Sequence, residues 1–164
     1  MASLQNKAVC LDELMPILRE RVEAGKTVKL SPKGISMLPM LRQGKDSVVL
    51  SKIDGEPKKY DVVLYQRANG QYVLHRLVGV KDGYVFLGDN QFDHEYGIER
   101  SQMIAYVTTF YRENKEISID SLPYKIYYKA WYSSRGLRRF IRRGVGFLKR
   151  RLGKICRKDK ADTE

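Results

Sequence analysis

The fold is indicated most clearly by residues 61–87, which read DVVLYQRANGQYVLHRLVGVKDGYVFL. Three runs rich in Val, Leu and Tyr, residue types that favour strands, are separated by Asn69-Gly70 and Asp82-Gly83. Asn-Gly and Asp-Gly pairs readily adopt the positive φ angles of tight hairpin turns. The stretch therefore predicts three successive antiparallel strands.

Similar runs extend on both sides of this stretch. Leu11–Ala24 differs and predicts a helix, because its apolar residues recur every three or four positions. The six runs that predict strands are Thr27–Leu30, Ser47–Ile53, Asp61–Gln66, Tyr72–Val78, Tyr84–Leu87 and Met103–Tyr111. We therefore expect a mostly β, antiparallel domain with one N-terminal helix.

The net charge of +12 is concentrated at the C-terminal end of the chain. Residues 1–123 carry 17 Lys and Arg against 16 Asp and Glu, whereas residues 124–158 carry 13 Lys and Arg and no acid. From Leu137 to Ile155 apolar residues recur at helical spacing with Arg and Lys between them, which is typical of an amphipathic helix. The sequence thus predicts a β domain over 1–123 and a basic amphipathic helical tail over 124–164.

Such a segregated positive block predicts a polyanionic partner. We favour an anionic membrane surface for residues 124–158, because aromatic anchors accompany the charge: Tyr127, Tyr128, Trp131, Tyr132, Phe140 and Phe147. Nucleic acid is the less favoured partner, since the sequence has no helix-turn-helix, zinc-finger or RNP-like motif. A helix that only packs its apolar stripe on the β domain is the third interpretation.

The ends of the chain predict its compartment. Met1–Lys7 lacks the apolar core of a signal peptide, and no run of 18 apolar residues occurs, so we expect a cytoplasmic protein that associates peripherally with a membrane. Cys10 and Cys156 lie far apart without metal-ligand spacing, which favours reduced thiols over a zinc site. We expect no metal and no other cofactor.

One serine and one histidine stand out as candidates for chemistry. Ser36 lies in Gly34–Leu41, a segment with glycine and proline where an isolated serine is ordinarily a loop residue. A nucleophilic serine needs a base, and the chain has two histidines, His75 and His94. By strand alternation His75 shares a face with Val73 and Leu77, where a purely structural histidine would fit equally well, whereas His94 lies in a polar loop.

Three ordered motifs within residues 27–112 resemble the type I signal peptidases and their LexA-like repressor relatives. They are Ser36-Met37-Leu38-Pro39, His75-Arg76 and Gly88-Asp89-Asn90. The bacterial members of this group use a lysine as general base, whereas the endoplasmic-reticulum type has histidine at that position. The resemblance therefore implies a peptidase of signal-peptidase/LexA-like fold, with Ser36 as nucleophile and His75 as base.

The resemblance also implies supporting roles for the acids that follow strand 84–87. Asp89 would pair with Arg76, and the acid that orients the histidine falls on Glu95, where the family has aspartate. Asp93 and Asp89 compete with Glu95 for this role, and all three acids are expected in one loop.

The resemblance places the oxyanion site at the Ser36 backbone N–H, with Met37 beside it in the cleft. Gly34 departs from those relatives that have a hydroxyl two residues before the serine.

Two functions remain open at this point. The resemblance implies a serine endopeptidase that cleaves a peptide or protein substrate, and the basic tail places it at a membrane surface. The alternative is a catalytically inert peptidase-like module that binds or regulates through the tail. The substrate, the cleavage site and the oligomeric state do not follow from the sequence.

Overall fold

A computed structural model of the chain describes residues 11–145. Cys10, Cys156 and the part of the predicted basic helix beyond residue 145 lie outside the described residues. The chain divides into two compact units, residues 1–125 and 126–164. Each unit is described below by itself.

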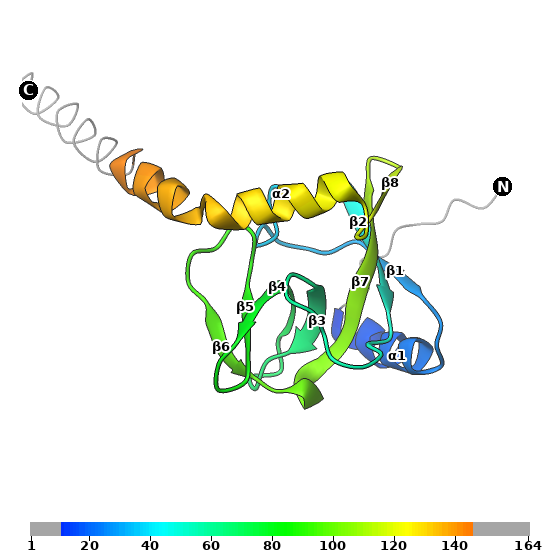
Figure 1. Cartoon of the computed structure of the whole chain (residues 1–164). Helices are drawn as coiled ribbons and strands as arrows, with labels where there is room; N and C mark the ends of the chain where they lie inside the picture. The colour runs from blue at the N-terminus through cyan, green and yellow to red at the C-terminus, as the bar shows by residue number, and fades with distance from the viewer. Residues whose placement is uncertain (1–10, 146–164) are drawn as a thin grey trace, which may run out of the picture. The chain divides into compact units, whose positions relative to one another are not determined.

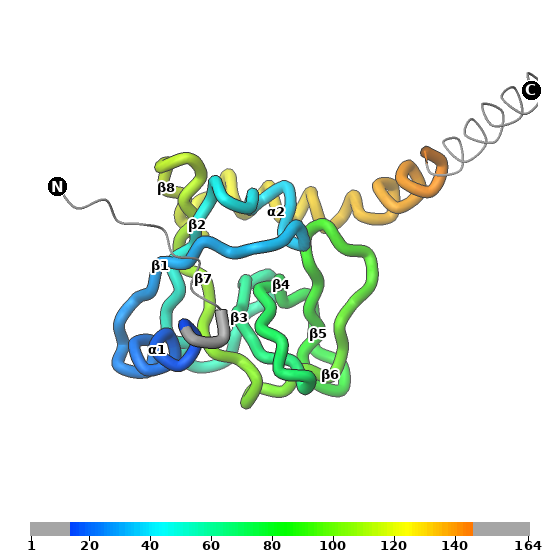
Figure 2. The backbone as a smooth tube through the Cα atoms, turned by 180° about the vertical axis from the view of Figure 1, so that it is seen from behind, coloured from blue at the N-terminus to red at the C-terminus, as the bar shows by residue number. Residues whose placement is uncertain are grey.

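The first unit is built on an antiparallel sheet, as predicted, with eight strands in the described part of the chain (Figure 1). Helix α1 (Leu11–Glu23) lies where a helix was predicted and packs beside β1 and β7 (Figure 2). The strands are β1 (Val28–Leu30), β2 (Asp46–Ser51), β3 (Val62–Gln66), β4 (Tyr72–Val80), β5 (Tyr84–Leu87), β6 (Glu95–Ile98), β7 (Met103–Arg112) and β8 (Lys115–Ser118). Their order in the sheet is β1-β2-β7-β3-β4-β5-β6, with β8 paired to β7.

The predicted turn at Asp82-Gly83 has positive φ at both residues, 49° and 104°, whereas at Asn69-Gly70 only Gly70 does, with a φ of 85°. These turns connect β3 to β4 and β4 to β5, so the three strands of residues 61–87 pair as predicted.

Two strands were not predicted from the sequence. β6 reads EYGI and β8 reads KEIS, and both are four residues long with charged residues and no clear alternation. Each is held as a strand by its neighbour, β5 or β7. The expectation that Glu95 lies in a loop is therefore wrong, because Glu95 is the first residue of β6.

The C-terminal part of the described chain is helical. Helix α2 (Leu122–Ser133) begins with Pro123 in its first turn, where proline is tolerated because its missing N–H would have no helical partner. A second helical segment follows over 135–145. Within these residues no helix has the length and apolar character needed to cross a membrane.

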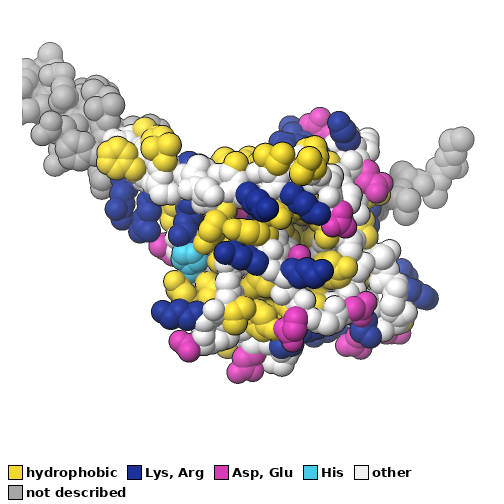
Figure 3. Space-filling model, viewed as in Figure 1, with side chains coloured by type: hydrophobic (Ala, Val, Ile, Leu, Met, Phe, Trp, Pro, Cys, Tyr) yellow, Lys and Arg dark blue, Asp and Glu magenta, His cyan; other side chains and the backbone are white. Residues whose placement is uncertain are grey.

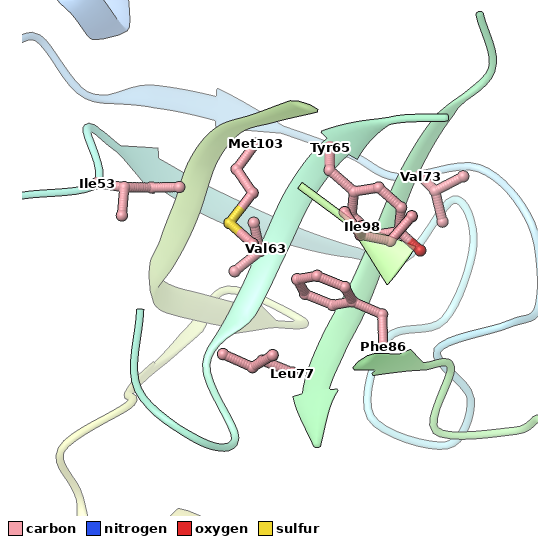
Figure 4. Packing of buried hydrophobic residues seen from close by; sticks show 8 residues of the cluster. All are labelled: Ile53, Val63, Tyr65, Val73, Leu77, Phe86, Ile98 and Met103. Atoms are coloured by element: carbon pink, nitrogen blue, oxygen red, sulfur yellow. The ribbon is translucent and has the colours of Figure 1, made fainter. Parts of the chain in front are cut away.

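One hydrophobic cluster in the core of the first unit lies on one face of β3 and β4 (Figure 4). Because side chains alternate between the two faces of a strand, Val63 and Tyr65 of β3 lie on the same face as Val73 and Leu77 of β4. Phe86 of β5 packs against them. The Tyr65 and Phe86 rings stack with their centroids 4.6 Å apart. Figure 4 shows the Tyr65 hydroxyl at the edge of this cluster, so the ring is part of the core while its oxygen remains available for hydrogen bonds.

A buried ion pair lies next to this core. Arg76 is 2 % exposed, and its Nε and Nη2 donate to the two carboxylate oxygens of Asp89 at 2.8 and 2.7 Å. Its Nη1 donates to the Tyr60 carbonyl at 3.0 Å and to the Tyr124 hydroxyl at 2.9 Å, and Nη2 lies 2.9 Å from the Met40 sulfur. One guanidinium therefore joins four segments of the chain to β4.

Replacing Asp89 with asparagine should destabilise the first unit strongly. Asp89→Asn keeps the side-chain shape but leaves the buried Arg76 without a counter-charge, a loss that typically costs about 3–5 kcal/mol. Denaturant unfolding followed by far-UV circular dichroism measures the change. Asp54→Asn, at an exposed position in the connection between β2 and β3, is the control and should change stability by less than about 0.5 kcal/mol. Equal stability of the two variants would contradict a structural role for the pair.

Candidate active site

Ser36 lies in a compact turn between β1 and β2. Gly34 has a φ of 98°, a conformation that favours glycine, and its N–H donates to Gln43 Oε1 at 2.8 Å. Two backbone hydrogen bonds follow, from Leu38 N–H to the Ile35 carbonyl at 3.2 Å and from Leu41 N–H to the Met37 carbonyl at 2.9 Å. They shape the backbone around a half-buried Ser36.

The Gly88-Asp89-Asn90 segment docks directly on this turn. Asn90 donates its N–H to the Ser36 carbonyl at 2.8 Å and its Nδ2 to the Ile35 carbonyl at 3.2 Å. Gly88 has no room for a side chain, because a Cβ there would lie 2.8 Å from the Ser36 carbonyl oxygen. Two of the three sequence motifs therefore meet at the backbone of the candidate nucleophile.

Ser36 and His75 line the same pocket. Its volume is about 320 Å³, and its walls are formed mainly by residues 32–37 and 71–75, with Leu41, Arg67 and Gln91 completing them. Within residues 11–145 no hydrogen bond joins the Ser36 hydroxyl to the His75 ring. Hydrogen bonds between catalytic groups are often long in ligand-free structures and tighten when substrate binds. The fold thus brings the two side chains into one cavity without closing the contact between them.

His75 is 2 % exposed and is engaged through one ring nitrogen. Its Nδ1 lies 3.2 Å from the Tyr65 hydroxyl and 3.8 Å from Glu95 Oε2. The Tyr65 hydroxyl in turn donates to the same Glu95 oxygen at 2.9 Å. The second nitrogen, Nε2, is on the opposite side of the ring and is the one that remains for a reacting group.

Glu95 is held in place by Arg67. The guanidinium Nε and Nη2 donate to the two carboxylate oxygens, each at 2.6 Å, and Nη1 donates to Gln71 Oε1 at 2.5 Å. Burial opposes ionisation of Glu95, but the hydrogen bonds from Arg67 and Tyr65 outweigh it and lower the pKa of the carboxyl. Glu95 is therefore an anion at neutral pH.

The three candidate acids occupy different places. Glu95 is the one beside His75, whereas both carboxylate oxygens of Asp89 bind Arg76, as the resemblance implied. Asp93 is exposed.

Tyr65 and Arg67 were missed by the sequence analysis. Tyr65 could have been found, because it is the one tyrosine in the apolar run 62–65 and the Asn69-Gly70 hairpin puts it on the same face of the sheet as His75.

The surroundings of His75 keep its imidazole neutral. Burial lowers the pKa of His75 to about 4, although the nearby Glu95 acts in the opposite direction and Arg67 adds to the lowering. A neutral imidazole has a free lone pair, so His75 can accept a proton at neutral pH.

The described residues contain no cluster of three or more His, Cys, Asp or Glu side chains suited to a metal ion. Comparison of the chain with protein-family models, with curated proteins and with solved structures finds no match in any of the three. Assignment of a function to this chain therefore depends on its own residues and their geometry.

The low pKa of His75 should make the folded state less stable in mild acid. Unfolded histidine has a pKa near 6.5, so between about pH 6.5 and pH 4 the unfolded chain binds a proton that the folded chain does not, and stability falls with pH. From pH 8 to pH 5 this loss amounts to roughly 2 kcal/mol, and the His75→Gln variant should not show it.

Denaturant unfolding of wild type and variant at both pH values tests this expectation. Between pH 8 and pH 5 the free energy of unfolding of the wild type should fall by roughly 2 kcal/mol more than that of His75→Gln. His94→Gln, which removes the other histidine, is the control. A pH dependence that His75→Gln leaves unchanged would show that the imidazole titrates normally in the folded protein.

Proposed function

We propose that this protein is a serine endopeptidase of the signal-peptidase/LexA-like kind, with Ser36 as nucleophile and His75 as general base. One observation carries the proposal: Ser36 and a neutral, buried His75 line one pocket although they are 39 positions apart in the chain. Glu95 beside Nδ1 supplies the negative charge that such a histidine needs once it is protonated.

The reaction would follow the usual course for an activated serine. Ser36 Oγ attacks the carbonyl carbon of the substrate while His75 Nε2 takes the hydroxyl proton and then passes it to the departing amine. A water molecule, deprotonated by the same nitrogen, then hydrolyses the acyl-enzyme and restores the serine. The Ser36 N–H is the proposed donor to the oxyanion, and loss of one such donor typically slows the reaction about 100- to 1,000-fold.

The strand that carries His75 offers a place for an extended peptide. Residues 72–75 of β4 pair with β3 along one edge, whereas the pairing of β4 with β5 begins at Arg76. The same residues line the pocket together with residues 32–37. A substrate segment could therefore add to β4 as a strand and bring its peptide bond to Ser36.

An electrophilic phosphonate probe tests the proposed nucleophile. It should label the wild-type protein at Ser36, with a rate that is constant from pH 6 to pH 8 and falls as the pH approaches 4, where His75 becomes protonated. Ser36→Ala and His75→Ala should both abolish labelling, as measured by intact-protein mass spectrometry. Ser31→Ala removes an exposed serine near the same turn and should label like the wild type.

The same experiment addresses the alternative function. The unformed Ser36–His75 hydrogen bond is also compatible with a non-catalytic module that acts through the basic helix. Absence of labelling in a folded wild-type protein, or equal labelling of all variants, would favour that module over the peptidase.

We also propose that the second unit binds an anionic membrane surface. The helical segment 135–145 carries five arginines and no acid, and its apolar side chains are largely exposed, with Phe140 at 76 % and Leu137 at 63 %. At 100° per residue the apolar side chains fall on one side of this segment and the arginines on the other. Figure 3 shows exposed hydrophobic side chains next to Lys and Arg along the C-terminal helices. Such a helix suits the boundary between lipid headgroups and acyl chains.

Vesicle co-sedimentation tests this placement. The protein should bind vesicles that contain phosphatidylglycerol and bind pure phosphatidylcholine weakly, and added salt should reduce the binding. Replacing Arg139, Arg142 and Arg143 with glutamine should weaken binding about 100-fold, since each cation near an anionic surface contributes about 1 kcal/mol.

The matched control removes three exposed cations from the first unit, as Lys45→Gln, Lys52→Gln and Lys81→Gln. This variant should bind vesicles like the wild type. Tighter binding to an oligonucleotide than to the anionic vesicles at the same salt concentration would make nucleic acid the partner.

A further inference from the structure

The link between Glu95 and His75 passes through a tyrosine. Glu95 Oε2 and His75 Nδ1 are 3.8 Å apart, which is too far for a direct hydrogen bond. The Tyr65 hydroxyl lies within hydrogen-bond distance of both, at 2.9 Å from the carboxylate and 3.2 Å from the imidazole. The contact of the acid with the histidine is therefore indirect in this structure.

The position of the Tyr65 hydroxyl is determined by the core. Tyr65 is fully buried, and its ring stacks on Phe86 (Figure 4). It lies edge-on to His75, with the ring centroids 6.2 Å apart. The ring cannot move without opening the packed cluster on β3 and β4. Arg67 holds the carboxylate on the other side, so both neighbours of the hydroxyl are constrained.

The single proton of the hydroxyl has one favourable place. Glu95 is ionised and can only accept, and burial together with Glu95 raises the pKa of Tyr65, so the tyrosine keeps its proton. Donation to a carboxylate is stronger than donation to a neutral nitrogen, and the carboxylate is also the nearer of the two acceptors. The Tyr65 proton therefore points to Glu95.

The tautomer of His75 follows from this assignment. A hydroxyl that donates its one hydrogen bond to Glu95 can only accept a hydrogen bond from the imidazole, so Nδ1 must carry the ring proton. Nε2 then has a free lone pair. In the reverse arrangement Tyr65 would donate to Nδ1, Nε2 would carry the proton, and the ring could not take a proton from Ser36.

We infer that Tyr65 is a positioning residue that transmits the orientation of Glu95 to His75 and selects the imidazole tautomer with a proton on Nδ1. Its consequence for the reaction rests on the proposed function, because that tautomer is the one able to act as a base toward Ser36. The tautomer itself is a property of the folded protein and does not depend on any activity.

Nuclear magnetic resonance reads the tautomer directly. In long-range ¹H–¹⁵N spectra of protein labelled with ¹⁵N-histidine at pH 7, His75, assigned from its loss in His75→Gln, should show a protonated Nδ1 and an unprotonated Nε2. A wild-type ring with its proton on Nε2 would overturn the inference without any variant.

Removing the hydroxyl tests its role. Tyr65→Phe keeps the stacked ring but leaves Nδ1–H without an acceptor, so the population of the other tautomer should rise, and labelling of Ser36 by the phosphonate probe should slow at least 10-fold, a fraction of what a general base contributes. The control is Tyr84→Phe, whose ring packs against the same core and whose hydroxyl binds Glu56 at the surface. It should keep the wild-type tautomer and labelling rate.

The two readouts separate two kinds of failure. A protein with the expected tautomer change but no labelling in any form would contradict the proposed function and leave the role of Tyr65 intact. Wild-type labelling and an unchanged tautomer in a folded Tyr65→Phe protein would overturn the role of Tyr65 and leave the peptidase proposal standing.

Discussion

The buried charge of Arg76 is the constraint on which the rest of the first unit depends. A guanidinium cannot lose its proton in a protein, so a fully buried arginine requires a counter-charge and acceptors for its N–H groups. Asp89, the Tyr60 carbonyl and the Tyr124 hydroxyl meet this requirement, and each comes from a different segment. These segments must therefore converge on β4 whenever the chain folds.

The position of the candidate nucleophile follows from this convergence. Asp89 lies between Gly88 and Asn90, which contact the backbone of Ser36 and Ile35. The ion pair thus anchors the segment that holds the serine turn.

His75 lies next to Arg76 in the chain but on the opposite face of β4, because successive residues of a strand point to opposite faces of the sheet. On that face it lies beside Tyr65 and Glu95. Arg76 therefore stabilises the fold, whereas its neighbour His75 belongs to the candidate active site.

The sequence predicted those parts of the fold and site that depend on local pattern. Alternating apolar residues and two turns placed the strands around His75, whereas the resemblance to signal peptidases and LexA-like proteins singled out Ser36 and implied the Arg76–Asp89 pair. It missed β6 and β8, because short polar strands form only where a neighbouring strand supplies their hydrogen bonds. It missed Tyr65 and Arg67 because nothing in the spacing of β3 relates them to a glutamate some thirty residues later.

By itself, the sequence determined the antiparallel hairpins, the basic C-terminal segment and the residue types available for chemistry, because strand pattern, turn geometry and charge are properties of neighbouring residues. Only the tertiary structure decided that Ser36 and His75 share a pocket, that Glu95 lies closer to the imidazole than Asp89, and that a tyrosine stands between acid and base. These relations arise from the pairing of strands and the burial of Arg76, which bring together atoms that are far apart along the chain.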